Sequence, residues 1–356
     1  MLEMPVTMLE VAFLLLFVAA SLSAWLTRCF CEPSSVLYLL DHPNERSLHT
    51  NPTPRTGGIA IVTATVVAGT GTAILIGGNL ARLGWLAGAL IIVGIVSFVD
   101  DRKHLAPRYR IVAHLFAALT LTWGGFVVNG AVFPGDSSTL PAWAAIIASL
   151  LYIMWSINLY NFMDGMDGFA GGMAVIGFST FAVLAWVGDQ PSFALLNAIV
   201  AAAVLGFLFF NFPPARIFMG DAGSSCLGLL VAAFSIWGAQ SGVFPFWIAL
   251  LIFSPFIVDA TVTLFLRLAR GEKVWQPHRT HYYQRLVRLG WGHKRTVLWE
   301  YVLMVACAVS GVAAVQLPIS WQWGFVWLWI AAYTVFGYGV YRLEIVNKKR
   351  QTLENV

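Results

Sequence analysis

Apolar runs of about 20 residues, the length that crosses a hydrocarbon core, follow one another from Met8 to Tyr341. The breaks between them are too short to hold a soluble domain. Of the 356 residues, 59% are hydrophobic and only 11% are charged, and the mean hydropathy is +0.76. This composition excludes a soluble globular protein. The sequence therefore predicts an all-α, polytopic integral membrane protein.

About eleven spans are predicted, and the distribution of basic residues orients them. The first span has no Lys or Arg before it and Arg28 just after it, so we expect an uncleaved helix whose N-terminus is periplasmic. Every Lys and Arg except Arg82 then falls in a cytoplasmic segment or an adjoining helix end, and the C-terminus is cytoplasmic. The predicted spans are 8–27, 57–78, 84–99, 110–128, 141–158, 169–187, 193–212, 223–240, 244–268, 296–317 and 323–341.

The cytoplasmic segments carry most of the ionisable residues, so we expect a single catalytic domain, 1–356, with its chemistry on that side. These segments are 28–56, 100–109, 159–168, 213–222 and 269–295, followed by the tail. The net charge of +4 is scattered over them, so no nucleic-acid partner is expected. The four cysteines show no zinc-ligand spacing and give little support to a disulfide.

Two adjacent carboxylates end the third predicted span, in the run SFVDDRKHLAPRYR. Asp100 and Asp101 at a membrane interface are costly unless they share a cation or a proton. The alternative is a solvated helix end beside Arg102 and Lys103.

The run SINLYNFMDGMDGFAGG places oxygen-bearing side chains at intervals of three residues, which predicts one polar stripe at a helix end. Such a stripe suits a hard cation such as Mg²⁺. The glycines of this run either let backbone approach a ligand or pack helices together. The stripe comprises Asn158, Asn161, Asp164 and Asp167.

The run FNFPPARIFMGDAGSS brings a further carboxylate, Asp221, to the start of a helix. Asp221 either joins the other acids or acts only as the helix N-cap. Phe218 is either a stacking platform for a base or an interfacial anchor.

The longest inner loop is basic and contains PHRTH at 277–281. Arg279 between His278 and His281 suits phosphate oxygens, whereas the other basic residues are expected to serve topology and anionic lipid headgroups. Acids that hold a metal and bases that hold phosphates are what phosphoryl transfer needs. The chain has no GxxxxGK[ST] motif, so ATP hydrolysis is not indicated.

With these motifs, the chain resembles the polyprenyl-phosphate N-acetylhexosamine-1-phosphate transferases over nearly its whole length. PRTGG (54–58), VDD (99–101), NFMDGMDG (161–168), NFPPARIFMGDAGS (211–224) and PHRTH (277–281) follow the family's order. The resemblance implies a bacterial inner-membrane enzyme that uses Mg²⁺, with Mn²⁺ as an alternative. It implies transfer of a sugar phosphate from a UDP-sugar to undecaprenyl phosphate, with release of UMP. Surrounding membrane lipids are further partners, and the choice between monomer and homodimer stays open.

The resemblance also implies a role for each matching residue. Phe218 is expected to stack on uracil with Arg55 near it, while Asp100 and Asp101 organise the acceptor, metal or phosphates. Asp100, Asp101, Asp164, His278 and His281 are predicted to be catalytic, Arg55, Arg108, Asp167, Asn211, Phe218 and Arg279 to bind substrate, and Asp221 and Asn161 to bind the metal.

One departure bears on the donor sugar. The peptidoglycan branch has three consecutive histidines where this chain has PHRTH, so we expect the O-antigen-initiating branch and lipopolysaccharide biosynthesis, with UDP-GlcNAc or a related deoxy-N-acetylhexosamine as donor. Direct attack of the lipid phosphate is preferred, with an aspartyl-phosphate path as the alternative.

The rival function is a secondary transporter, which would place carboxylates near mid-membrane in broken helices. Asp259 is the carboxylate assigned to a span interior, where it either pairs with a basic residue or lines a lipid groove. The other candidate acids lie at inner span ends, which favours an enzyme.

Overall fold

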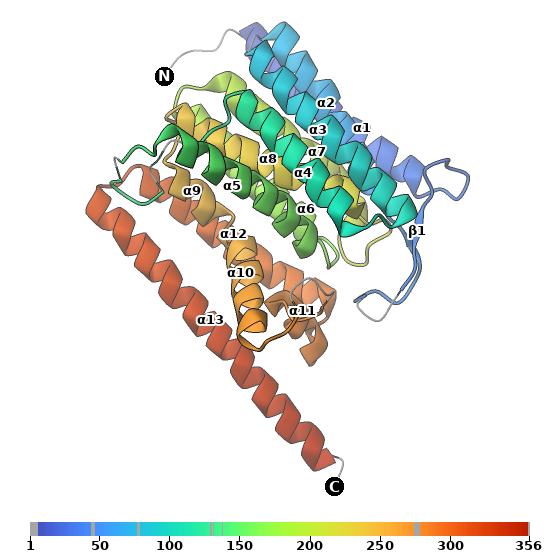
Figure 1. Cartoon of the computed structure of the whole chain (residues 1–356). Coiled ribbons are helices and arrows are strands. Elements are labelled where there is room, and N and C mark those ends of the chain that lie inside the picture. Colours follow the sequence, from blue (N-terminus) through green and yellow to red (C-terminus); the bar gives the residue numbers. More distant parts are fainter. Residues whose placement is uncertain are drawn as a thin grey trace.

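The structure is a computed structural model that describes residues 6–43, 47–76, 79–128, 130, 132–136, 138–273 and 278–354. Pro277, the first residue of PHRTH, lies outside the described residues, as do positions 129, 131 and 137 of a predicted outer loop. The described chain is almost entirely helical (Figure 1). The all-α prediction is confirmed.

Helices occupy all eleven predicted span positions, and the ninth position holds two helices, α9 and α10, at an angle. The long helices are α1 (Val6–Phe30), α2 (Gly57–Leu75), α3 (Leu80–Lys103), α4 (Pro107–Trp123), α5 (Ala142–Met163), α6 (Phe169–Val187), α7 (Pro191–Asn211), α8 (Gly220–Gln240), α10 (Ser254–Ala269), α12 (Gly292–Val315) and α13 (Ile319–Glu354). The short elements are β1 (Leu40–Asp41), β2 (Thr53–Pro54), α9 (Phe246–Ile252), α11 (Tyr282–Leu286) and the π-helix η1 (Val287–Trp291).

Nine helices in the described part of the chain are long and apolar enough to cross a membrane, and the α9–α10 pair brings the number to ten. The remaining candidate, α4, has 17 residues, so it is about 25 Å long and slightly short of a typical hydrocarbon core. The protein is a multi-pass membrane protein. The count of eleven spans and their orientation stay predictions.

Helices α1 to α8 form one bundle with α8 at its centre (Figure 1). Within the most apolar window of α8, 94% of the residues are buried. Small residues allow this approach, as they do in many membrane bundles. A Cβ on Gly58 of α2 would lie 2.1 Å from the Cα of Gly223 of α8, so the two helices cross at glycine.

Helices α9 to α13 form the other side of the molecule (Figure 1). The chain bends by 79° between α9 and α10, where Pro255 in the first turn of α10 removes a backbone donor. Helix α13 has 36 residues, a length of about 54 Å. Only 11% of its most apolar window is buried, so its sides face outward.

A short antiparallel pair, β1–β2, connects α1 with α2 and touches the loop that precedes α8. The Phe218 N–H donates to the Pro54 carbonyl at 2.7 Å, and the Gly57 N–H donates to the Phe218 carbonyl at 3.0 Å. The PRTGG and NFPPARIFMGDAGS motifs, far apart in sequence, are therefore joined by backbone hydrogen bonds.

Candidate active site

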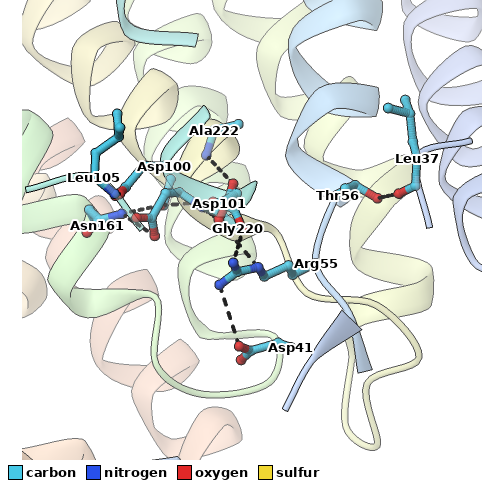
Figure 2. A network of polar contacts seen from close by, with 12 residues as sticks. Leu37, Asp41, Arg55, Thr56, Asp100, Asp101, Leu105, Asn161, Gly220 and Ala222 are labelled. Atoms are coloured by element: carbon cyan, nitrogen blue, oxygen red, sulfur yellow. Dashed lines mark hydrogen bonds and ion pairs between the residues drawn. The ribbon is translucent and has the colours of Figure 1, made fainter. Parts of the chain in front are cut away.

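Asp101 closes the N-terminus of α8, although it belongs to α3. Its two carboxylate oxygens accept the backbone N–H groups of Asp221 and Ala222 at 3.2 and 3.1 Å (Figure 2). Unpaired N–H groups and the helix dipole make a helix N-terminus a good site for an anion. Asp101 is 3% exposed, so the last turn of α3 is fixed against the first turn of α8.

Arg55 links this contact to the β1–β2 segment. Its guanidinium lies 3.7 Å from the Asp101 carboxylate and 3.5 Å from Asp41 (Figure 2), and it also donates to the Asp101 carbonyl. Gly220, which precedes Asp221, has φ +74° and would place a Cβ 2.2 Å from the Arg55 carbonyl. Glycine is required here because both the backbone angle and the space exclude a side chain.

Arg110 of α4 connects three polar residues from three other helices. Its guanidinium lies 3.1 Å from Asp100 of α3 and 3.7 Å from Asp221 of α8. It also donates to the Asn161 side-chain oxygen of α5 at 3.1 Å. From the sequence, Arg110 was interpreted only as a charge that orients the helices, although it is the last residue of the run SFVDDRKHLAPRYR. The structure places it at the centre of what we call the acid cluster: Asp100, Asp101, Asn161, Asp164 and Asp221.

Asn161 and Asp221 are in direct contact. The Asn161 amide donates to the Asp221 carboxylate at 2.9 Å and to the Ser224 hydroxyl at 3.0 Å. Asp221 lies in the first turn of α8, while the N-cap position is Met219. The alternative in which Asp221 is only an N-cap is therefore wrong, because Asp101 supplies the capping carboxylate.

Two further sequence interpretations need correction. Asp100 and Asp101 are 6% and 3% exposed and paired with Arg110 and Arg55, so they do not form a solvated helix end. The predicted polar stripe is also wrong, because α5 ends at Met163. Its members diverge: Asn158 contacts His114 of α4 at 3.2 Å, whereas Asp167 turns toward His293. Helical spacing was extrapolated beyond the end of the helix.

Asp164 forms the C-cap of α5 beside the other acids. Burial, with the nearby carboxylates of Asp221 and Asp101, raises the pKa of the Asp164 carboxyl to about 8. No donor among the described residues bonds to this carboxylate. Four carboxylates thus share two guanidiniums, and the raised pKa means that Asp164 holds a proton near pH 7, in a place where a bound cation would stabilise the ionised form.

Asp167 and Asn211 shape the loop before α8. Asp167 accepts the Ala215 N–H at 3.0 Å and lies 3.1 Å from the His293 ring. Asn211 accepts the Gly168 N–H at 3.0 Å and donates to the Ile217 carbonyl at 2.9 Å. Both predicted substrate-binding residues are thus near the acid cluster but engaged in holding backbone. His293 was not identified from the sequence, although it lies in the predicted cytoplasmic segment 269–295. The structure places it in the first turn of α12.

Phe218 and Arg108 have different surroundings. The Phe218 ring is partly buried and meets the His49 ring edge-on, with centroids 4.8 Å apart. Arg108 is exposed and lies over the ring of its neighbour Tyr109. None of its described contacts reaches the acid cluster, where Arg110 is found instead.

Asp259 of α10 contacts the last residue of PHRTH and the two residues that follow it. Asp259 accepts the backbone N–H groups of Tyr282 and Tyr283 at 2.9 and 3.3 Å and lies 3.2 Å from the His281 ring. Asp259 thus has a basic partner in His281, and it also lines a cavity between α10 and α13, so the two alternatives are not exclusive. Burial lowers the pKa of His278 to about 4, so its ring is neutral near pH 7.

No described contact joins His278, Arg279 or His281 directly to the acid cluster. Tyr283 makes the nearest connection, because a Cβ on Gly165 would lie 2.2 Å from its hydroxyl. Gly172 packs under the Tyr301 ring in the same way. The helix-packing interpretation therefore holds for Gly172 of α6, whereas Gly165 packs from the loop between α5 and α6.

Glu300 is a second carboxylate inside a predicted span, and it was not identified from the sequence. It lies in α12, is 6% exposed, and lines a cavity of about 290 Å³ with Asp259 and Tyr333.

Among the residues that the structure describes, no three His, Cys, Asp or Glu side chains converge closely enough to bind a metal ion unaided. The donor set nevertheless suits Mg²⁺. Hard oxygen ligands are present in Asp221 and Asp164, and Mg²⁺ usually takes only one or two carboxylates and completes its shell with water and phosphate oxygens.

Known proteins resemble the part of the sequence that forms most of this site. The sequence profile of glycosyl transferase family 4 matches residues 83–239, which include Asp100, Asp101, Asn161 and Asp221. A phospho-N-acetylmuramoyl-pentapeptide-transferase of Shouchella clausii (strain KSM-K16) is 31% identical over 276 residues, covering 73% of this chain and 82% of the relative. The chain belongs to the polyprenyl-phosphate N-acetylhexosamine-1-phosphate transferase family.

Other relatives in this family are named for a different sugar. A probable undecaprenyl-phosphate N-acetylglucosaminyl 1-phosphate transferase of Bacillus subtilis (strain 168) is 29% identical, with 83% of this chain and 80% of the relative covered. A decaprenyl-phosphate N-acetylglucosaminephosphotransferase of Mycobacterium leprae (strain TN) is 31% identical, with 77% and 76% covered. The protein is thus a membrane-embedded transferase. Similar identities to both branches do not choose between donor sugars.

Proposed function

We propose that the protein transfers an N-acetylhexosamine-1-phosphate from a UDP-sugar to undecaprenyl phosphate. An oxygen of the lipid phosphate attacks the β-phosphorus, the bond from that phosphorus to the bridging oxygen breaks, and UMP leaves. The lipid diphosphate sugar is the other product. The observation that carries the proposal is the convergence of Asp100 of α3, Asn161 of α5 and Asp221 of α8 around Arg110, in a chain of this family.

The chain's own residues supply position and charge, which account for most catalysis of phosphoryl transfer. Arg110 and Arg55 are the cations within the acid cluster, so they are suited to phosphate oxygens that enter it. Phe218 offers a partly buried ring for a flat base, beside His49. Asp259 holds the His281 ring and the backbone of the two residues that follow PHRTH, a segment that we assign to the diphosphate and sugar.

Mg²⁺ is part of the proposal, since the carboxylates of the acid cluster outnumber its guanidiniums and supply oxygen donors. Asp221 and Asn161 would hold it, with Asp164 beside them. When bound, Mg²⁺ neutralises negative charge on the diphosphate.

Direct attack is preferred because both members of the aspartate pair are already engaged. Asp101 accepts two backbone N–H groups, and Asp100 pairs with Arg110 and accepts the Leu105 N–H at 2.6 Å. Carboxylates held in this way are poor nucleophiles. A lipid phosphate is largely dianionic near pH 7 and needs no strong base.

The proposed location is the bacterial inner membrane, with the acid cluster open to the cytoplasm. The proposed donors are UDP-GlcNAc or a related deoxy-N-acetylhexosamine, in O-antigen or other surface-polysaccharide assembly. This choice rests on PHRTH in place of three histidines.

The decisive experiment incubates the purified protein with undecaprenyl phosphate and UDP-GlcNAc labelled in the uridine. We expect labelled UMP with Mg²⁺ and none after chelation. Absence of UMP with every UDP-N-acetylhexosamine would exclude the proposed reaction. Omission of the lipid tests the path: a stoichiometric burst of UMP would favour an aspartyl-phosphate, and no burst supports direct attack.

Transport is not proposed as a second function. Asp259 and Glu300 lie within membrane helices, yet Asp259 is occupied by hydrogen bonds from Thr263 and from the first two residues of α11. Glu300 is a single buried acid beside a cavity, whereas the acids that gather form the acid cluster at the helix ends.

A further inference from the structure

A second cavity, of about 370 Å³, lies between the end of α10, the α11–η1 segment and the second half of α13. Figure 1 shows these elements grouped apart from the α1–α8 bundle. Six cationic side chains line it, and the acid among its lining residues is Glu344. We call it the basic cavity, and its cations are Arg267, Arg270, Arg279, Arg285, Arg288 and Lys348.

Two carboxylates are already matched to two of these cations. Arg285 donates twice to Glu344, with both distances 2.7 Å, and Arg267 lies 2.8 Å from Glu272. Arg270 is exposed and 3.9 Å from the same Glu272.

The remaining three cations have no carboxylate of their own among the residues that line the cavity. Arg279 donates to the Ser47 carbonyl at 3.5 Å, Lys348 shares Glu344 electrostatically with Arg285, and Arg288 and Lys348 are exposed. The basic cavity therefore keeps a surplus of positive charge, which an anionic group can neutralise.

Apolar side chains lead from the membrane-spanning part of both helices to the basic cavity. On α10, Phe265 is 63% exposed and Leu266, which lines the cavity, is 39% exposed. On α13, Tyr341 also lines the cavity and is 55% exposed. In a membrane helix, exposed apolar side chains face acyl chains. The surroundings thus fit a molecule with an anionic head and apolar tails.

We propose that the basic cavity binds the phosphate headgroup of an anionic phospholipid whose acyl chains lie along α10 and α13. Guanidinium groups bind phosphate oxygens through paired, charge-assisted hydrogen bonds, and basic cavities between membrane helices bind anionic headgroups. The bound lipid would tie α13 to α10 and the PHRTH segment, because Arg279 and Thr280 line the same cavity.

The test compares two double variants of the full chain. Arg288→Gln with Lys348→Gln removes two exposed cations from the basic cavity, whereas Arg342→Gln with Lys349→Gln removes equal charge from α13 outside it. Binding of phosphatidylglycerol, against phosphatidylcholine, is measured by native mass spectrometry of the purified protein. We expect the cavity variant to bind phosphatidylglycerol about tenfold more weakly and the control to change by less than about twofold.

Other outcomes overturn the proposal. Equal weakening in both variants would show that general attraction to α13 is enough. Occupancy by inorganic phosphate or glycerol phosphate at the same concentrations would make it a soluble-anion site, and displacement one for one by undecaprenyl phosphate would make it an acceptor site. Circular dichroism and the melting temperature without lipid show whether both variants fold. If the cavity variant does not fold, a third pair from the same cavity, Arg270→Gln with Arg288→Gln, replaces it.

Discussion

The acid cluster and the basic cavity both lie where membrane helices end, yet they treat charge in opposite ways. In the acid cluster, Asp101 and Asp100 are buried and each is held by partners from other helices. In the basic cavity, the cations outnumber the carboxylates, and Arg288 and Lys348 are exposed. The difference separates a site that fixes reacting groups from a surface that accommodates a flexible ligand. Substitutions should therefore be costly in the first region and mild in the second.

The largest effect is expected at Asp221. Asp221→Ala removes the carboxylate that contacts Asn161 and faces Arg110, so UMP release should fall about a thousandfold or more. Folding should persist, because Asp101 still caps α8. Asp136→Ala, in the loop between α4 and α5, is the control. A rate within about tenfold of the unaltered protein would remove Asp221 from the reaction.

The next effect distinguishes two neighbouring arginines. Arg110→Gln leaves Asp100 and Asp221 without their shared cation, so kcat should fall about a hundredfold. Arg108→Gln, two residues earlier, should change it by less than about threefold, because Arg108 contacts only Tyr109 among the described residues. Steady-state kinetics measure both, and the reverse order would support the sequence prediction over the structure.

A smaller effect is expected where the two regions are connected. Asp259→Asn weakens the hydrogen bonds that hold Tyr282 and Tyr283, so the PHRTH segment becomes less ordered. KM for the UDP-sugar should rise about tenfold with little change in kcat. Thr263→Val removes only one partner of Asp259 and should have a weaker effect. A fall in kcat at constant KM would place Asp259 in the chemical step instead.

The smallest effect concerns pH and Asp164. Its pKa is raised from 3.8 to about 8 in the folded protein, so between these values the folded state retains a proton that the unfolded state has lost. Stability from this group is therefore full below pH 3.8, decreases as pH rises toward 8, and is lost above that. In chelator, the melting temperature of Asp164→Asn should fall less over this range, by about 2 °C. Identical pH slopes would contradict the raised pKa.

Hydropathy and motif order predicted the helical membrane fold, because spans of apolar residues need no knowledge of their partners. All five members of the acid cluster were also candidates from the sequence. Asp100, Asp101, Asn161, Asp164 and Asp221 lie in the quoted motifs, at or just beyond the inner ends of predicted spans.

Partners across helices could not be predicted in this way. Arg110 and Arg108 are chemically alike and two residues apart, and only the packing of α4 against α3 and α5 decides which one meets the acids. The polar stripe failed for a local reason: α5 ends at Met163, so periodicity no longer relates Asp164 and Asp167 to Asn161. The role of Asp259 could not be predicted, because it depends on the bend at Pro255 and on how the PHRTH segment folds against α10.

The capping of α8 by Asp101 has a consequence for biosynthesis. Chains are made from the N-terminus, so α3 is inserted long before the ribosome reaches Ala222. Until then Asp101 has no helix end to close and Asp221 does not exist to face Arg110. The nascent protein therefore cannot assemble the acid cluster early, and the moment at which α8 docks is also the moment at which the site first exists.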